Sequence, residues 1–261
     1  MSQRVLLRID GGVATLSLNR PEVMNAMDGE TMIELRAASE LVARDPAVRV
    51  IVLRGEGPAF CAGGDVALFH QRLDDLPQLI VQLGREMHFA LWALRRAPKP
   101  VLAVVHGTVA GAGFSLLCAA DLAIAADDTR FTLAYTNIGT SPDGGSSHFL
   151  PRLLGYKRAM QVTLLPDMFD AATARDYGLV NWTVPAGSLA EEAQRIAARL
   201  AKGPTVAYGE AKRLLNASFD RGMETQMEDE LIAFGRCAVT EDLREGVTAF
   251  VQKRKPSFHG V

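Results

Sequence analysis

The chain has 261 residues, of which 48% are hydrophobic and 22% charged, so it can bury a sizeable core and long disorder is excluded. Its 28 basic and 30 acidic residues form no block of like charge, which argues against a nucleic acid as partner. No targeting segment is visible, and the longest apolar run, residues 101–105, is strand-length, so we expect no membrane partner. The three cysteines are an odd number without metal-ligand spacing, which favours a reducing, cytoplasmic location.

Strands and helices alternate in the first half of the chain. Residues 5–8 and 14–19 read as paired strands around the turn at Gly11 and Gly12. Asp28 is the expected N-cap of a helix that ends at Asp45 and Pro46. Further strands are predicted at residues 48–53, 101–105, 122–126 and 130–133, and further helices at residues 76–96 and 111–120.

Helices dominate the last third of the chain. They are predicted at residues 148–154, 157–165, 171–177 and 189–201, and over nearly everything after Pro204. The order of strand, strand and helix indicates an α/β core built as stacked ββα units. We expect this core, with the functional site, to span residues 1–200 and a separate helical layer to span residues 201–261.

Two glycine-bearing segments each follow a predicted buried strand and open a predicted helix. They are AFCAGGD at residues 59–65 and GTVAGAG at residues 107–113. Small residues let a ligand approach the backbone, and a helix N-terminus leaves N–H groups unpaired and aimed at negative charge. Either segment alone could be only a turn or a packing point between helix and strand. Together, two such ends can form an oxyanion hole.

Over nearly its whole length the sequence resembles the enoyl-coenzyme A hydratase/isomerase, or crotonase, superfamily. The resemblance is carried by LNRPEVMNAM at 18–27, AFCAGGDV at 59–66, KPVLAVVHGTVAGAGFSLLCAADLAIAADDTRF at 99–131, SPDGG at 141–145 and EGVTAFVQKRKPSF at 245–258. It implies a crotonase (ClpP-like) spiral of ββα units with a C-terminal helical trimerisation region. It also implies an enzyme that stabilises the enolate of an acyl-coenzyme A thioester, with coenzyme A as part of the substrate and no separate cofactor.

The resemblance assigns roles to individual residues. The oxyanion donors are the backbone N–H groups of Gly64 and Ala112, and a backbone donor tolerates the methyl group of Ala112 if its φ is negative. Asp65 is read as a cap of the next helix. Contacts with the substrate or coenzyme A are assigned to Ala62, Gly64, Asp65, Val66, Ala112, Tyr135, Phe250 and Lys253, of which the last two approach coenzyme A beside a neighbouring subunit.

The departures from the hydratase pattern concern the acid–base groups. Hydratases of the family carry two glutamates, which align with Ser115 and Tyr135 here. Adding water requires one group that takes a proton from water and another that delivers one to carbon 2, and neither residue is a good base near neutral pH. Instead, Asp143 stands where hydratases have a glycine, although Pro-Asp-Gly is also ordinary turn chemistry. It resembles the single acidic residue of Δ3,Δ2-enoyl-CoA isomerases and epoxyphenylacetyl-CoA isomerases.

An isomerase that moves a double bond from the 3 to the 2 position, with Asp143 as its single base, is therefore the favoured function. The alternatives are an enoyl-CoA hydro-lyase, a thioester hydrolase or dehalogenase in which Asp143 attacks covalently, and an inactive acyl-CoA-binding protein. Dehalogenating relatives have a histidine at the position of Trp92, and its absence disfavours that alternative.

Several polar residues receive structural interpretations. His106 and His148 are interpreted as a strand end and a helix face, and Asp121 as a cap or turn residue. No cluster with metal-ligand spacing is visible, so we predict no metal. The expected assembly is a homotrimer or a dimer of trimers.

Overall fold

The computed structural model describes residues 3–261, and its largest sheet has six strands in the order β1-β2-β3-β4-β6-β9. The strands are β1 (Val5–Asp10), β2 (Val13–Leu18), β3 (Val50–Gly55), β4 (Val101–Val105), β6 (Leu122–Ala126) and β9 (Trp182–Val184). β1 and β2 are antiparallel, and the other pairs are parallel. Gly11 and Gly12 both have positive φ at the two-residue turn, as a type I′ hairpin requires.

A second sheet has three strands, β5 (Thr108–Ala110), β7 (Arg130–Thr132) and β8 (Phe169–Asp170). The strands predicted in both sheets are confirmed, with ends that differ by one or two residues. Strands β5, β8 and β9 are not predicted from the sequence, because runs of two or three residues carry no visible alternation. β5 matters for the site, since it lies inside the second glycine segment and leads directly into a buried helix.

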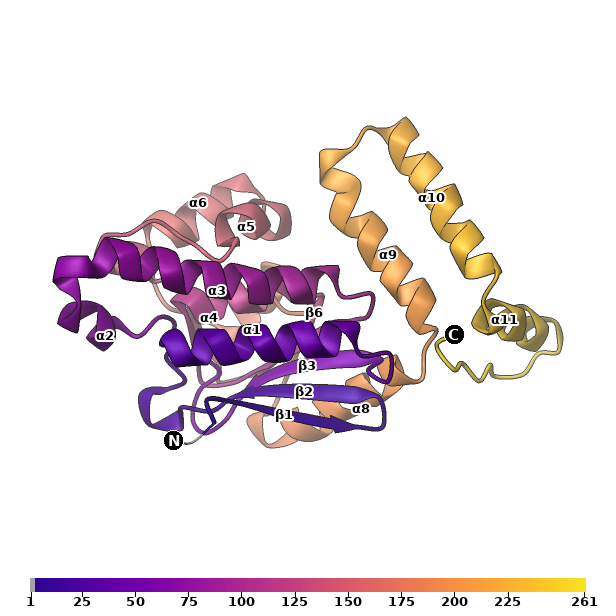
Figure 1. The fold of residues 1–261 in the computed structure, drawn as a ribbon, viewed down its shortest axis with the longest axis horizontal. Coiled ribbons are helices and arrows are strands. Elements are labelled where there is room, and N and C mark those ends of the chain that lie inside the picture. Colours follow the sequence, from indigo (N-terminus) through magenta and orange to yellow (C-terminus); the bar gives the residue numbers. More distant parts are fainter. Residues whose placement is uncertain (1–2) are drawn as a thin grey trace.

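The six-stranded sheet is covered on both faces, as Figure 1 shows for α1 and α3 on one side and α8 on the other. The covering helices are α1 (Gly29–Arg44), α3 (Leu76–Arg96) and α8 (Leu189–Ala201). Ile51 and Leu53 of β3 join the larger core, while Val50 and Val52 face the cluster that contains α8. Burial on both faces explains the continuous apolar runs of the parallel strands.

Local signals in the sequence begin and end these helices. Asp28 caps α1, because its carboxylate accepts a hydrogen bond from Thr31 N. α4 (Gly111–Ala119) is apolar on every side and is buried from Ala112 onward, as expected of a helix surrounded by core. The remaining helices of the core are α2 (Val66–Gln71), α5 (Ser146–Leu154), α6 (Tyr156–Leu164) and α7 (Ala171–Asp176).

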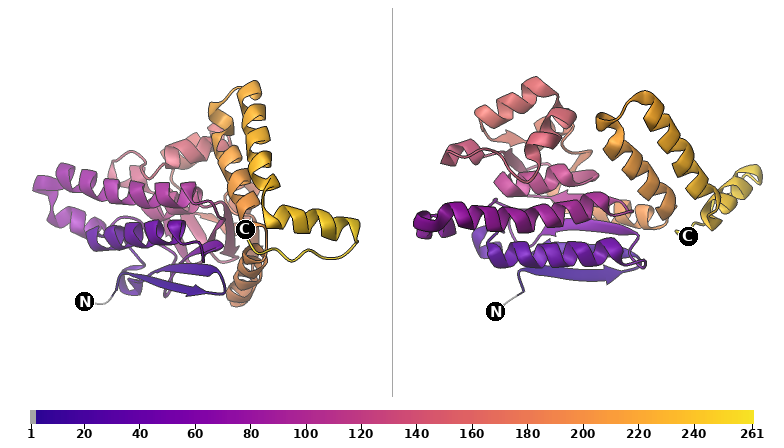
Figure 2. Two further views of the ribbon diagram at one scale, coloured as in Figure 1. Left: turned by 45° about the vertical axis from the view of Figure 1, so that its right-hand side comes forward. Right: turned by 45° about the horizontal axis from the view of Figure 1, so that its top comes forward.

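Three helices follow the core, α9 (Thr205–Ala217), α10 (Met223–Ala238) and α11 (Glu241–Val251). Figures 1 and 2 show the α9–α10 hairpin standing beside the core and α11 extending away from it. The division at residue 200 stays a prediction. Asp121 lies in the predicted bend between α4 and β6, and in addition its carboxylate pairs with Lys212 of α9 at 2.7 Å and accepts from Val101 N of β4 at 2.8 Å. This buried pair fastens α9 to the sheet.

Candidate active site

The two glycine segments lie against each other. Cys61 and Val109 form an isolated parallel bridge, in which Cys61 N donates to Thr108 O at 3.2 Å and Ala110 N donates to Cys61 O at 2.9 Å. A Cβ atom at Gly63 would lie 3.1 Å from Ala110 O and 3.4 Å from Ala112 N. The backbone of the first segment therefore touches the N-terminus of α4.

Glycine at position 113 allows the close approach of the two glycine-bearing segments. A Cβ atom at this position would lie 2.5 Å from the carbonyl oxygen of Cys61, a distance that no side chain tolerates. Gly63 and Gly111 have φ values of 107° and 50°, which glycine adopts readily. The interpretation of these glycines as packing points is thus correct for Gly113, and the same packing brings the segments together at the start of α4.

Gly64 and Ala112 offer N–H groups at this junction. Met27 N donates to Gly63 O and Asp65 N donates to Met27 O, and Gly64 N donates to no backbone or side-chain acceptor within residues 3–261. Ala112 is the second residue of α4, so its N–H has no partner inside the helix. The N-cap residue, Ala110, supplies no side-chain acceptor. The structure therefore brings together two N–H groups that are available to an oxyanion.

Asp65 is occupied by structural contacts. Its carboxylate accepts from Leu68 N at 3.1 Å and pairs with Arg20 at 3.0 Å, so the predicted helix cap is confirmed. Ala62 N donates to Met24 O, and Val66 begins α2 half-exposed. Direct contact of these residues with a substrate stays a prediction.

Asp143 lies against the first turns of α4. Ser115 is one helical turn beyond Ala112, and its hydroxyl donates to Asp143 O at 3.0 Å. Ser146 at the start of α5 also binds Asp143 O, through its N at 3.1 Å and its Oγ at 2.8 Å. The backbone of Asp143 is thus held beside the predicted oxyanion donors by residues of α4 and α5.

Tyr135 holds the side chain of the same aspartate. Its hydroxyl donates to Asp143 Oδ1 at 2.5 Å and lies 2.9 Å from Ser115 Oγ. Burial, and then the negative charge of Asp143, raise the pKa of Tyr135 far above its usual value. The phenol therefore stays protonated and acts as a hydrogen-bond donor.

The loop that carries Asp143 has no spare room. Gly144 has a φ of 56°, and a Cβ there would lie 2.8 Å from Met87 Cε and 2.8 Å from Ser115 Cβ. A Cβ atom at Gly145 would likewise lie 3.0 Å from Cε2 of the Phe149 ring. Met87 and Ser146 were not identified from the sequence, because a buried methionine and a serine at a helix start carry no signal of function.

The other candidates lie away from this centre. Phe250 is 85% exposed on α11, and Lys253 follows the end of that helix with a φ of 53°. In Figure 1, α11 lies at the right edge of the molecule and α2 at the left edge, so contact with coenzyme A from a neighbouring subunit stays a prediction. His106 Nε2 lies 2.8 Å from Gly57 O, and His148 is exposed on α5, as their structural interpretations require.

Within residues 3–261, no three His, Cys, Asp or Glu side chains gather as metal ligands would. No helix in the described part of the chain is long and apolar enough to cross a membrane. The predicted absence of a metal or separate cofactor stays a prediction.

Unpaired N–H groups near a firmly held carboxylate are the arrangement that many enzymes use to stabilise an oxyanion next to an acid–base group. The family profile described as enoyl-CoA hydratase/isomerase matches residues 8–261. The chain belongs to the enoyl-CoA hydratase/isomerase family and has the crotonase fold.

Relatives named as isomerases and relatives named as hydratases both match the chain over nearly its whole length. The 1,2-epoxyphenylacetyl-CoA isomerase of Escherichia coli K12 is 35% identical over 263 residues, covering 100% of each chain. The crotonyl-CoA hydratase of Syntrophomonas wolfei is 36% identical over 263 residues, covering 98% of each. The crystal structure of an enoyl-CoA hydratase from Polaromonas superposes with a TM-score of 0.93 at 32% identity, covering 98% of this chain and 99% of that one.

Proposed function

We propose that the protein is an acyl-CoA isomerase that moves a double bond from the 3 position into conjugation with the thioester, using Asp143 as its only acid–base residue. The observation that supports this most is the position of Asp143: its backbone is bound to Ser115, one turn beyond Ala112 on α4. The residue that carries this carboxylate is thereby held against the helix of the predicted donor Ala112, while a serine and a tyrosine occupy the two positions of the hydratase glutamates.

The proposed reaction needs one base and one oxyanion hole. Asp143 takes a proton from carbon 2 of the 3-enoyl thioester, and the electrons of that C–H bond pass into the carbonyl group to form a dienolate. The N–H groups of Gly64 and Ala112 stabilise the negative oxygen. The same carboxyl group then delivers the proton to carbon 4, which leaves the double bond between carbons 2 and 3 and restores the carboxylate.

Hydration and covalent catalysis are less well supported. Tyr135 is kept protonated by burial and by Asp143, so it cannot replace a carboxylate as a base for water. A covalent aspartyl ester would need a base to hydrolyse it. Met87 of α3 lies against the Asp143 loop. Trp92, at the position of the histidine of dehalogenating relatives, is half-exposed beneath the guanidinium of Arg96.

Replacement of the aspartate tests the proposal. Asp143→Asn should lower 3-enoyl-CoA isomerisation by roughly 100- to 10,000-fold, as loss of an acid–base group does, while acyl-CoA still binds. The absorbance of the conjugated thioester measures the reaction, and Ser115→Ala is the matched control. The control should stay near the parent, because Ser146 still holds Asp143 O and Tyr135 still holds its carboxylate. The proposal fails if Asp143→Asn keeps full activity, or if the parent hydrates 2-enoyl-CoA rapidly and isomerises nothing.

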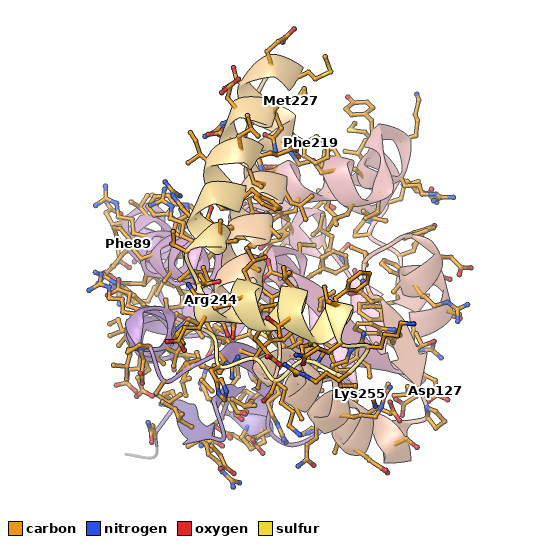
Figure 3. All side chains as sticks on the ribbon, turned by 90° about the vertical axis from the view of Figure 1, so that its right-hand side faces the viewer. Phe89, Asp127, Phe219, Met227, Arg244 and Lys255 are labelled. Carbon is orange, nitrogen blue, oxygen red and sulfur yellow. The ribbon has the colours of Figure 1, made fainter. Side chains whose placement is uncertain are left out.

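The assembly forms part of the proposed function, as a homotrimer or a dimer of trimers. The single chain exposes 13831 Å², whereas a compact monomer of 28.2 kDa exposes roughly 11,000 Å². Met223, Met227, Leu231 and Phe234, each more than half exposed, recur at helical spacing as one apolar stripe of α10. Figure 3 shows Met227 projecting from the upper part of this helix. Subunits that cover this stripe would account for the excess area.

A further inference from the structure

Tyr135 has more contacts than a residue that only lines a substrate pocket requires. Its hydroxyl donates to Asp143 Oδ1 and lies within hydrogen-bond distance of Ser115 Oγ. Within residues 3–261, the carboxylate of Asp143 has no other hydrogen-bond partner than this phenol. One oxygen of the carboxylate is therefore bound, and the other, Oδ2, is free.

The backbone directs Tyr135 toward this contact. Ala134 immediately before it has a φ of 58°, a left-handed conformation that costs a residue with a side chain roughly 1–3 kcal/mol and persists only where the surroundings enforce it. This conformation opens the short 3-10 helix Tyr135–Ile138, and Thr136 Oγ1 anchors that helix by donating to Thr163 O of α6 at 2.9 Å. The left-handed backbone at Ala134 and the anchored 3-10 helix therefore fix the position of Tyr135.

We propose that Tyr135 is the positioning residue of the general base: it fixes the Asp143 carboxylate through Oδ1 and leaves Oδ2 as the oxygen that carries the migrating proton. This inference rests on the proposed isomerase function and adds which atom performs the transfer. Oδ2 removes the proton from carbon 2, becomes a hydroxyl, and returns the same proton to carbon 4. Since rotation about the Asp143 side chain would break the bond to Tyr135, the proton stays on the substrate side between the two steps.

The surroundings make the turnover number a direct measure of this contact. Contacts of residues 143–145 come from Met87 of α3, Ser115 of α4, and Ser146 and Phe149 of α5, none of which ionises in the working range, and from Tyr135. Burial and the neighbouring carboxylate raise the pKa of Tyr135, so the phenol stays protonated in that range. Replacing Tyr135 with phenylalanine therefore removes a hydrogen bond to the carboxylate without changing the charge of the site.

The test compares Tyr135→Phe with Tyr156→Phe in the full chain, using 3-hexenoyl-CoA as the probe. Tyr156 is largely exposed on α6, so its variant controls for the loss of a phenol hydroxyl. For Tyr135→Phe we expect kcat to fall roughly 10- to 100-fold, the effect of losing a hydrogen bond to a charged group. KM should stay unchanged, while Tyr156→Phe matches the parent in both quantities.

A double variant separates this inference from the proposed function. Tyr135→Phe should have no further effect in the Asp143→Asn background, because the tyrosine acts through the aspartate. The inference is overturned if Tyr135→Phe keeps the parent kcat, or if its effect multiplies with that of Asp143→Asn. If Asp143→Asn alone leaves isomerisation intact, the proposed function fails instead. Unchanged melting temperatures of the single variants would show that the kinetic effects do not come from unfolding.

Discussion

Ala112 contributes only its backbone N–H to the proposed chemistry, and its methyl group fits because α4 begins one residue earlier, at the left-handed Gly111. The donor can therefore be removed only by a residue without a backbone N–H, which is proline. In the same way, Asp143 is held through its carbonyl oxygen by Ser115 and Ser146. At the scale of single residues, most of the site is backbone, and few side chains take part directly.

Ala112→Pro should remove the donor and raise the barrier by about 3 kcal/mol, or roughly 100- to 1,000-fold in kcat. Proline is tolerated in the first turn of a helix, where the missing N–H has no partner. Ala172→Pro is the matched control, since Ala172 is the exposed second residue of α7, and it should keep parent activity. An Ala112→Pro enzyme that is folded and fully active would contradict the assignment of this oxyanion donor.

At the scale of elements, the close contact of α4 with residues 59–64 depends on Gly113. Gly113→Ala should destabilise the protein by roughly 1–3 kcal/mol, because a methyl group there meets the Cys61 carbonyl and overpacks the core. Gly84→Ala is the opposite case, since Gly84 lies within α3 with nothing close to its Cβ position, and alanine favours a helix. Thermal unfolding should show a lower midpoint for the first variant and an equal or higher one for the second.

The end of the chain contains an acid-sensitive contact. Hydrogen bonds from Arg254 and from the backbone of Ser257 lower the pKa of Glu245 from 4.5 to about 2. Because the pKa in the folded chain is the lower one, this contact stabilises fully above pH 4.5 and is lost as the pH falls toward 2. The protection of residues 252–261 against hydrogen exchange, taken relative to the intrinsic exchange rate at each pH, should therefore fall over that interval in the parent. In Glu245→Gln this protection should already be low at neutral pH, and equal protection in both proteins would exclude the contact.

Helices and strands with strong local signals could be predicted from the sequence. Strands β3, β4 and β6 and helices α1, α3 and α4 are confirmed, because long apolar runs and caps such as Asp28 are local signals. Strand β5 was missed because it has only three residues. The pairing of Asp121 with Lys212 was missed because the two residues lie 91 positions apart in the chain. The resemblance identified Asp143 and Tyr135 separately, but only the fold places them in hydrogen-bond contact.

For the whole molecule, the apolar stripe of α10 gives a direct test of assembly. Leu231→Glu combined with Phe234→Glu should place charges on this stripe and convert a trimer or hexamer into monomers of 28.2 kDa. Ile33→Glu combined with Leu41→Glu is the control, because both residues are also more than half exposed, on α1 of the core. Light scattering at micromolar concentration measures the mass. A parent protein that is monomeric under these conditions would exclude the proposed assembly.

The packing of Gly144 on Ser115 also has a consequence for how this family can diversify. A glutamate at position 115 would extend toward the Asp143 loop, where a Cβ atom at Gly144 would already lie 2.8 Å from Ser115 Cβ. We expect the loop to withdraw in that case, and the proposed base, Asp143, to move with it. Hydratase and isomerase sites are then separated by changes that must occur together. Among related chains, a small residue at position 115 and a carboxylate at position 143 should accordingly be inherited as a pair.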